Sequence, residues 1–179
     1  DVDIPVVAVS GKVTRNGAIL PDQVVDRGSV AFVGASGSLA VALGATDFAD
    51  YAVTLLPGTY DVIYTGASAE CLTAPDNLMP CGGGPLATDV ALTSSGVLDV
   101  DVRAIEVSGA VTHGGAALPN LGDARGALRW TRVSAGGAEP LMGPLMGPRI
   151  DLGTDGPRQY AAFVMPGRWV VEHAANPAL

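Results

Sequence analysis

The stretch Asp1-Val-Asp-Ile-Pro-Val-Val-Ala-Val-Ser-Gly-Lys-Val-Thr14 returns 98 residues later as Asp99-Val-Asp-Val-Arg-Ala-Ile-Glu-Val-Ser-Gly-Ala-Val-Thr112. The alignment continues without a gap to residue 33, with 14 identities in those 33 positions. Further along the offset is 109, so that Leu43-Gly44 matches Leu152-Gly153 and Pro57-Gly58 matches Pro166-Gly167. A repeat of about 100 residues is the size of a domain and too long for a solenoid turn. The sequence therefore predicts two domains in series.

The repeat also places the domain boundaries, at 1–103 for the first unit and 104–179 for the second. The second copy carries 11 extra residues near 134–151, which we expect in a surface loop, because long loops are tolerated there. Its match ends at Leu179, which aligns with Glu70, so we expect this unit to be incomplete. Residues 1–5 match the end of the first unit and are interpreted as the tail strand of a preceding repeat.

The chain is expected to be all-β. Short runs rich in valine and threonine alternate with turns, and the sequence holds 24 glycines and 13 prolines without a sustained helical period. This pattern is typical of sandwiches and barrels, and we predict tandem Greek-key β-sandwich domains. Residues 6–14 and 105–112 should form the first strand of each unit, followed by a turn at Asn16-Gly17 or Gly114-Gly115, where a positive φ is readily adopted. Residues 96–102 should form one half-buried strand that alternates between apolar and acidic positions. A turn at Ser94-Ser95-Gly96 should connect it to a strand at 87–93.

Aromatic residues occupy the same three places in both copies. They are Phe32, Tyr51 and Tyr60 in the first unit and Trp130, Tyr160 and Trp169 in the second. Large side chains retained at equivalent positions fill a core more often than they form an exposed platform for sugar rings. We therefore expect these six residues in the two cores.

Charge and hydropathy exclude two classes of partner. The formal net charge is −8, Lys12 is the single lysine, and the arginines are scattered. A nucleic-acid-binding protein would show a basic stripe, so we expect no nucleic acid. No apolar run reaches the ~18 residues that a membrane-spanning helix needs, so we expect no membrane span.

The first strand and a later hairpin resemble a known family. Val9-Ser-Gly-Lys-Val-Thr-Arg-Asn-Gly17 and Tyr51-Ala-Val-Thr-Leu-Leu-Pro-Gly-Thr-Tyr-Asp-Val62 look like the motifs of carboxypeptidase regulatory-like, or transthyretin-like, β-sandwich repeats of bacterial surface proteins. The resemblance implies a secreted location, outside the cell or on the bacterial surface, and roles in scaffolding, adhesion or accessory binding. Some relatives carry a Lys–Asn isopeptide crosslink, but Lys12 aligns with Ala110 and is better interpreted as a solvated strand residue.

Cys71 and Cys81 are the only cysteines, and they lie in a loop rich in glycine and proline. In a secreted chain two cysteines this close predict a disulfide. Closing a loop of about 11 residues stabilises a fold by roughly 2–3 kcal/mol on the chain-entropy model. A metal site would need further Cys or His ligands nearby, and a redox motif would need Cys-x-x-Cys.

Four aspartates are the candidates for a calcium site near the junction of the two units: Asp1, Asp3, Asp99 and Asp101. Residues two apart share a strand face, with carboxylates roughly 7 Å apart. Calcium needs six to eight oxygen ligands, and no further ligand loop is evident, so a solvated strand face is the competing interpretation. No other cofactor is expected. His113 and His173 lie at non-equivalent positions and are interpreted as surface residues.

No nucleophile, base and acid are spaced as catalysis requires, so we expect a protein that is not an enzyme. The leading hypothesis is an extracellular structural or adhesive module of a bacterial surface protein or filament. Its incomplete second unit would expose a sheet edge to which the segment Asp1–Val9 of another copy could add as a strand. Its partners would then be other copies or neighbouring repeats. The alternative is a module that binds a surface or glycan ligand through residues that the sequence does not identify.

Overall fold

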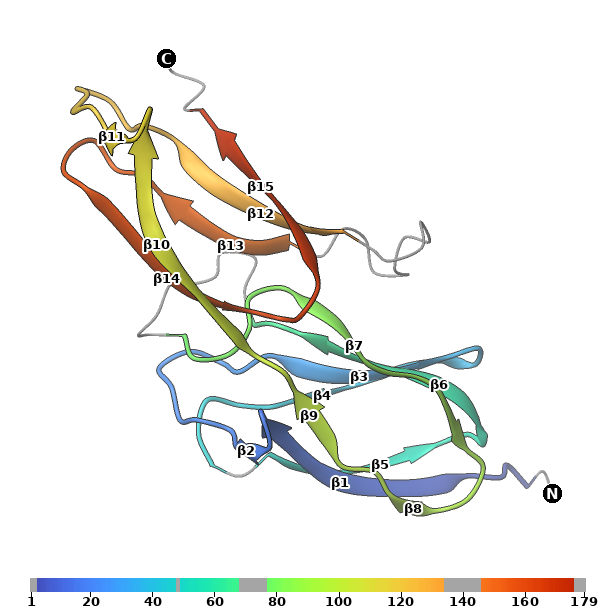
Figure 1. The fold of residues 1–179 in the computed structure, drawn as a ribbon. Coiled ribbons are helices and arrows are strands. Elements are labelled where there is room, and N and C mark those ends of the chain that lie inside the picture. Colours follow the sequence, from blue (N-terminus) through green and yellow to red (C-terminus); the bar gives the residue numbers. More distant parts are fainter. Residues whose placement is uncertain (1–2, 48, 68–76, 134–145, 176–179) are drawn as a thin grey trace.

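The computed structural model describes residues 3–47, 49–67, 77–133 and 146–175. Among these residues there is no helix, and the chain folds into two β-units that follow one another along the molecule (Figure 1). The expected all-β class and β-sandwich architecture are confirmed. The junction expected near residue 103 falls between two strands, since β9 ends at Val102 and β10 begins at Ile105.

The first unit packs two sheets against each other. In the first sheet β1 pairs with β2 and β5 along one of its edges. β8 and β9 run parallel to β1 and pair with its other edge. The second sheet has the order β4-β3-β6-β7 and is antiparallel throughout. The strands are β1 (Val7–Arg15), β2 (Ala18–Ile19), β3 (Ser29–Gly34), β4 (Gly37–Ala42), β5 (Asp50–Leu55), β6 (Gly58–Thr65), β7 (Gly83–Leu92), β8 (Gly96–Val97) and β9 (Val100–Val102).

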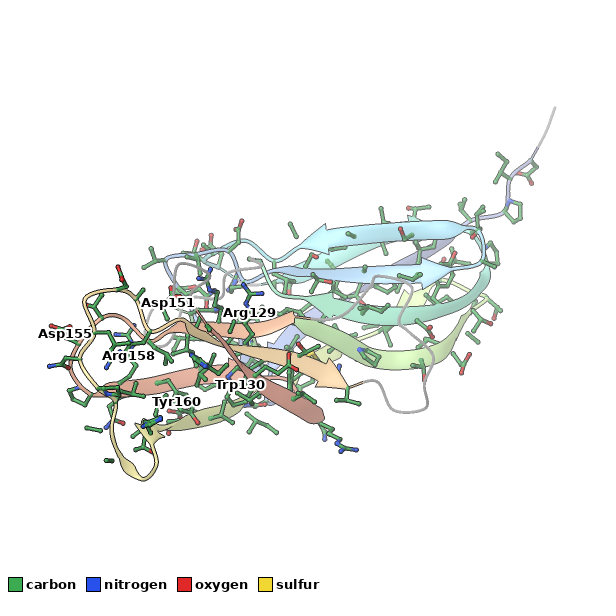
Figure 2. The ribbon with its side chains drawn as sticks, turned by 90° about the horizontal axis from the view of Figure 1, so that it is seen from above. Arg129, Trp130, Asp151, Asp155, Arg158 and Tyr160 are labelled. Carbon is green, nitrogen blue, oxygen red and sulfur yellow. The ribbon has the colours of Figure 1, made fainter. Side chains whose placement is uncertain are left out.

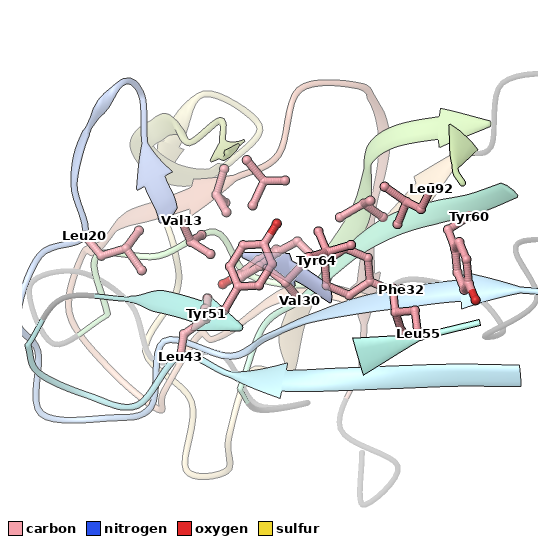
Figure 3. Close-up of a cluster of buried hydrophobic side chains, with 14 of the residues drawn as sticks. Val13, Leu20, Val30, Phe32, Leu43, Tyr51, Leu55, Tyr60, Tyr64 and Leu92 are labelled. Atoms are coloured by element: carbon pink, nitrogen blue, oxygen red, sulfur yellow. The ribbon is translucent and has the colours of Figure 1, made fainter. Parts of the chain in front are cut away.

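Alternating apolar residues of the two sheets form the core of this unit (Figure 3). Along β1, Val7, Val9 and Val13 are buried. Ala8, Ser10 and Lys12, which alternate with the inward positions, are exposed. Phe32 on β3 meets Tyr51 on β5 with ring centroids 5.5 Å apart, so the two sheets are joined by an aromatic pair. Burying each large apolar side chain contributes roughly 1.5–3 kcal/mol, which makes this cluster the main source of stability.

The second unit has two three-stranded sheets, in the orders β11-β10-β14 and β13-β12-β15. β10 pairs with β14 as β1 pairs with β5, and Gly109 lies opposite Tyr160 as Gly11 lies opposite Tyr51. The strands are β10 (Ile105–His113), β11 (Ala116–Ala117), β12 (Ala127–Val133), β13 (Met146–Asp151), β14 (Arg158–Val164) and β15 (Arg168–Ala174). The extra residues near 134–151 lie partly in β13; residues 134–145 are outside the described part of the chain.

The same turn follows β1 and β10. Asn16 and Gly17 have φ values of 51° and 77°, and Gly114 and Gly115 have 59° and 82°. Two successive residues with positive φ make the hairpin turn that matches the twist of the strands. Asparagine and glycine adopt this conformation most readily, as the sequence predicted.

The end of the first unit differs from the prediction. Residues 96–102 do not form one strand, because β8 and β9 are separated at Leu98 and Asp99. The turn before them does not close a hairpin either, since β7 pairs with β6 in one sheet while β8 and β9 pair with β1 in the other. The alternation of apolar and acidic residues indicated the inward face correctly, but it could not show that the chain changes sheet.

The aromatic prediction holds fully in the first unit and only partly in the second. Phe32, Tyr51 and Tyr60 are buried, and so is Trp130. Trp130 on β12 and Tyr160 on β14 approach from facing sheets, with centroids 6.1 Å apart (Figure 2). Tyr160 and Trp169, however, are only partly buried. The second core is therefore more open than the first.

Candidate functional site

The junction between the two units is built around a linker of two residues, Arg103 and Ala104. The side chain of Asn16, at the tip of the β1–β2 turn, binds both backbone groups of Ala104. Its Nδ2 donates to the Ala104 oxygen at 2.9 Å, and its Oδ1 accepts from the Ala104 N–H at 2.9 Å. The Asn16 N–H also donates to the oxygen of Val102 at 3.2 Å. The linker is thus held much as a strand residue would be.

Arg15 extends this contact into the second unit. Its guanidinium lies 4.4 Å from the centroid of the Phe163 ring on β14, a cation–π arrangement. Burial lowers the pKa of Arg15, and the neighbouring carboxylate of Glu106 on β10 raises it in part. The guanidinium of Arg15 on β1 therefore lies against the second unit, over the ring of Phe163.

A second contact forms where β7 begins. The Cys81 N–H donates to the Phe163 oxygen at 2.8 Å, and Cys81 forms an isolated parallel bridge with Val164. Met165 follows β14 and is 3% exposed, because its side chain joins the hydrophobic cluster of the first unit. Arg132 donates to the Gly83 oxygen at 3.2 Å and to the Pro166 oxygen at 2.8 Å.

Gly84 explains why this second contact can close. A Cβ atom at Gly84 would lie 1.7 Å from Nη1 of Arg132 and 3.3 Å from Sδ of Met165. A larger residue would push both side chains away from the first unit. Residues 15–16, 81–84, 103–106, 132 and 163–166 together are called the joint below.

Two strands of the second unit, β10 and β15, each have one edge without a described partner strand. β10 has β14 and β11 on one side, and no described strand lies on the other side, where β8 and β9 lie against β1. The outer edge of β15 is likewise without a described partner, whereas β6 is paired with β7. Ile105 is consequently 47% exposed and Val171 is 46% exposed, while the equivalent Val7 and Val62 are 3% and 0% exposed.

Two of the four candidate calcium ligands are engaged in another way. Oδ1 of Asp99 accepts the Lys12 N–H at 2.8 Å. Oδ1 of Asp101 accepts the Gly17 N–H at 2.8 Å and the Thr14 hydroxyl at 2.8 Å. Their carboxylates therefore attach β9 to β1 and to the turn after it. The sequence offered a calcium site or a solvated strand face for these aspartates, and neither interpretation included these bonds.

The other two candidates add no further ligands. Asp3 is exposed, and Asp1 lies outside the described residues. In the part of the chain that the structure describes, no group of three or more His, Cys, Asp or Glu side chains could hold a metal ion. Calcium stays a prediction from the sequence.

The predicted disulfide can be placed only at one end. Cys81 is 1% exposed and lies in the joint, and no described cysteine is a free thiol. Cys71 lies outside the described residues, so the pairing of Cys71 with Cys81 stays a prediction.

The remaining candidates lie on the surface. Lys12, His113 and His173 are exposed. His173 nevertheless has a defined partner, since its Nε2 lies 2.8 Å from the oxygen of Arg125 and must donate to it. The equivalent Tyr64 hydroxyl donates to the oxygen of Arg27 at 2.9 Å. The described residues contain no helix that is long and apolar enough to cross a bilayer.

The sequence reasoning missed two buried arginines. Arg27 is 1% exposed and donates to the oxygens of Leu43, Gly44, Thr46 and Asp47. Arg125 is 5% exposed and donates to the oxygens of Pro119, Leu152, Gly153, Asp155 and Gly156. Each guanidinium thus satisfies the carbonyls of the loop after the fourth strand of its unit. The signal that could have identified them is the repetition of the Arg-Gly and Leu-Gly pairs in both copies.

The joint residues gave no such signal. Arg15 and Asn16 align with His113 and Gly114, and Met165 aligns with Leu56, which is 41% exposed. Residues of a junction that occurs once in the chain need not be repeated, so a search for repeats passes over them.

Comparisons with known proteins leave the family open. No family model matches the chain, and no curated protein matches it. A solved structure of a DUF3823 family protein from Bacteroides ovatus is 13% identical, with a TM-score of 0.34 over 90% of this chain and 81% of that one. A streptococcal ancillary pilin is 10% identical, with a TM-score of 0.38 over 96% of this chain and 54% of that one. Such distant likenesses carry no functional argument.

Proposed function

We propose that this chain is a non-catalytic extracellular module of a bacterial surface protein or filament, which holds successive β-sandwich units at a fixed angle as a structural or adhesive spacer. The joint is the observation that supports this proposal. Domains joined by an ordinary linker are expected to move relative to one another unless their interface is large and apolar. Here the linker has two residues, and contacts on both sides of it restrict such movement.

The contacts of the joint act in different directions. Asn16 fixes the path of the linker, Arg15 contacts β14 through Phe163, and Met165 packs into the core of the first unit. A hinge at residues 103–104 would have to break a pair of hydrogen bonds and withdraw a buried methionine at the same time. That coupling is what a rigid spacer requires and what a flexible Gly/Ser linker lacks.

Assembly by strand addition between copies extends this proposal, and β10 and β15 are the strands on which it can be tested, since each has one edge without a described partner. An unpaired strand edge is a template for a strand from another chain. Because Ile105 on β10 and Val170 on β15 are 47% and 42% exposed, an added strand would cover apolar surface as well as form backbone bonds. Assembly by strand addition between copies is therefore part of the proposal.

The rigidity can be measured by residual dipolar couplings from backbone amides of both units. A fixed joint gives one alignment tensor for the two units. The variant Asn16→Gly keeps the positive φ of the turn and removes both bonds to Ala104. We expect its two units to give separate tensors, at least when it is combined with Arg132→Ala.

The matched control is Gly114→Asn, which places an asparagine on the equivalent turn of the second unit, where no described atom lies within 4 Å of an added Cβ atom. It should leave the single tensor unchanged. Two independent tensors in the unaltered chain would contradict the proposal of a rigid spacer.

Glycan binding remains the alternative function, and the burial of the aromatic residues argues against it. Four of the six repeated aromatic residues are buried, so few ring faces are free to stack on sugars. Selective, dose-dependent binding on a glycan array, lost on Trp169→Ala, would reverse this ranking.

A further inference from the structure

We propose that β4 pairs along its open edge with β4 of a second copy of this chain, so that the two first units share one continuous antiparallel sheet. The pairing is two-fold symmetric and centred on Ala40, with Leu39 of each copy opposite Val41 of the other. This inference goes beyond the proposed spacer and does not depend on strand addition at β10 or β15. It concerns how two copies associate through a strand that lies wholly within the first unit.

β4 is a regular edge strand. It pairs with β3 over six consecutive positions without a bulge, from Ser29 opposite Ala42 to Gly34 opposite Gly37. Among the described residues no strand pairs with its other side. A regular edge of this kind carries a row of backbone N–H and C=O groups that can pair with another chain.

The direction of these backbone groups follows from the bond just beyond the end of β4. The Leu43 N–H donates to the Gly28 oxygen at 2.9 Å, so this bond is directed towards β3. In an antiparallel ladder bonded and non-bonded pairs alternate, so every second residue turns its N–H and C=O to the same side. The odd-numbered residues of β4 therefore bond to β3. The even-numbered residues, Ser38, Ala40 and Ala42, turn their backbone groups to the open side.

The equivalent edge strand of the second unit is protected against such pairing. β13 contains Pro148 and an ion pair between Arg149 and Asp151, whose Nη2 and Oδ1 atoms are 3.1 Å apart. Its register against β12 shifts between Arg129 and Thr131, which interrupts the regular spacing of the edge. Proline, charged side chains and bulges are the features by which edge strands avoid pairing with other chains.

β7, at the opposite edge of the sheet that contains β4, is protected as well. It contains Pro85 and Asp89, and its register against β6 shifts twice between Tyr60 and Ile63. β4 has none of these features, because it reads Gly-Ser-Leu-Ala-Val-Ala and the whole stretch 28–46 contains no charged residue. In a chain with a net charge of −8, two copies can approach along this neutral edge without bringing like charges together.

The inward side of β4 shows which side chains the pairing covers. Val41 packs against the core cluster of the first unit, and Leu39, two residues away on the same side, is 39% exposed. Phe32, which lies opposite Leu39 on β3, is 0% exposed. The core is therefore closed at β3 and only partly closed at β4. In the proposed register each copy places Val41 beside Leu39 of the other, and apolar cross-strand pairs of this kind stabilise a sheet.

The register also satisfies the open backbone groups of both copies. Antiparallel pairing centred on Ala40 places Ser38 opposite Ala42 of the second copy and Ala40 opposite itself. These are the residues that face the open side, so each pair can exchange two backbone bonds. An edge that is complementary to itself closes into a two-fold dimer, which is why we assign the partner as a second copy.

The test measures self-association of the 179-residue chain by sedimentation velocity over a wide concentration range. Ala40 is exposed, so Ala40→Lys should leave the fold intact while it places two lysines opposite each other at the centre of the pairing. We expect the unaltered chain to form a dimer and Ala40→Lys to weaken the dimer at least ~10-fold, because like charges directly opposite each other destabilise a strand pair. Ala40→Glu should weaken it for the same reason.

A mixture of the Ala40→Lys and Ala40→Glu chains should dimerise again, because opposite charges then meet across the two-fold axis. Damage to the fold by either change would give no such recovery. Ala52→Lys is the matched control, since Ala52 is also an exposed alanine and lies on β5 in the other sheet. It should associate as the unaltered chain does.

Amide hydrogen exchange gives a readout at single residues on the same samples. The N–H groups of Ser38, Ala40 and Ala42 should exchange quickly in dilute protein and become protected as the concentration rises. Those of Leu39 and Val41 should be protected at every concentration, because they bond to β3.

Absence of association in the unaltered chain would overturn the inference. Association that Ala40→Lys leaves unchanged would overturn it too, and so would a mixture of the two charged variants that stays monomeric. Protection of residues 38, 40 and 42 that does not depend on concentration would show that another part of the chain covers the edge, which is equally incompatible with the inference. None of these results affects the alignment tensor of the two units within one chain, so the proposed spacer stands or falls separately.

Discussion

β1 and β10 share the sequence Val-Ser-Gly-x-Val-Thr and the same pairing with a following strand, yet they differ in burial. β1 alternates between buried and exposed residues, whereas no residue of β10 is fully buried. The difference lies in their neighbours, because β8 and β9 cover the free side of β1 and no described strand covers that of β10. An alternating pattern thus predicts a strand and its inward face, while the burial of that face depends on what lies beside it.

The loops after the fourth strands show the opposite case. Arg27 and Arg125 make nearly the same set of bonds to backbone oxygens, although the units differ in core and edges. A buried guanidinium is stable only when its donors are satisfied. This local arrangement is complete within each unit, so it does not depend on neighbouring strands.

The largest effect should come from removing these arginines. Arg27→Met leaves the oxygens of Leu43, Thr46 and Asp47 without their donors, and we expect the free energy of unfolding to fall by about 3–5 kcal/mol. Far-ultraviolet circular dichroism during urea unfolding measures it. Arg125→Met should lower the stability of the second unit comparably, as reported by fluorescence, because both tryptophans lie in that unit.

The control is Arg129→Met, an exposed position on β12, which should change stability by less than about 0.5 kcal/mol. Equal losses at Arg27 and Arg129 would refute the view that the loop oxygens depend on the buried guanidinium.

Val62 and Val171 test the contrast in burial directly. They are aligned valines, 0% and 46% exposed. Val62→Ala should lower the free energy of unfolding by about 2–3 kcal/mol, since it removes two buried methyl groups and leaves a cavity. Val171→Ala should lower it by less than about 0.5 kcal/mol. A large loss at Val171 would indicate that this face is covered in solution.

Reduction should act on the first unit alone. If Cys71 and Cys81 are paired as predicted, a reductant should destabilise the first unit by roughly 2–3 kcal/mol. Tryptophan fluorescence should change only through the joint, where Cys81 contacts β14. Mass spectrometry before and after reduction checks the pairing. An unchanged mass after reduction would show that Cys71 and Cys81 are not paired.

Alkaline pH should have the smallest effect. Burial, with a smaller contribution from Asp99, raises the pKa of Tyr51 to about 12, and burial raises the pKa of Tyr64 as well. The fold therefore favours the neutral hydroxyls, so this stabilisation is complete below the pKa of about 10 of an unfolded tyrosine. It is lost as the pH rises toward 12.

Urea midpoints measured between pH 9 and 12 should fall, and Tyr51→Phe should make that fall shallower. An equally steep fall in Tyr51→Phe would exclude Tyr51 as a cause. The variant should also be less stable at neutral pH, because it loses the hydrogen bond from the hydroxyl to the Leu98 oxygen.

The sequence by itself determined the all-β class, the first strands, the turns at Asn16-Gly17 and Gly114-Gly115, and the first aromatic core. These follow from alternation and from backbone preferences, which are local. Only the tertiary structure decided that β8 and β9 cross to β1, that Asp99 and Asp101 bind backbone N–H groups, and that Asn16 and Met165 form a joint. Those features depend on which distant strands become neighbours, and no pattern of spacing along one chain encodes that.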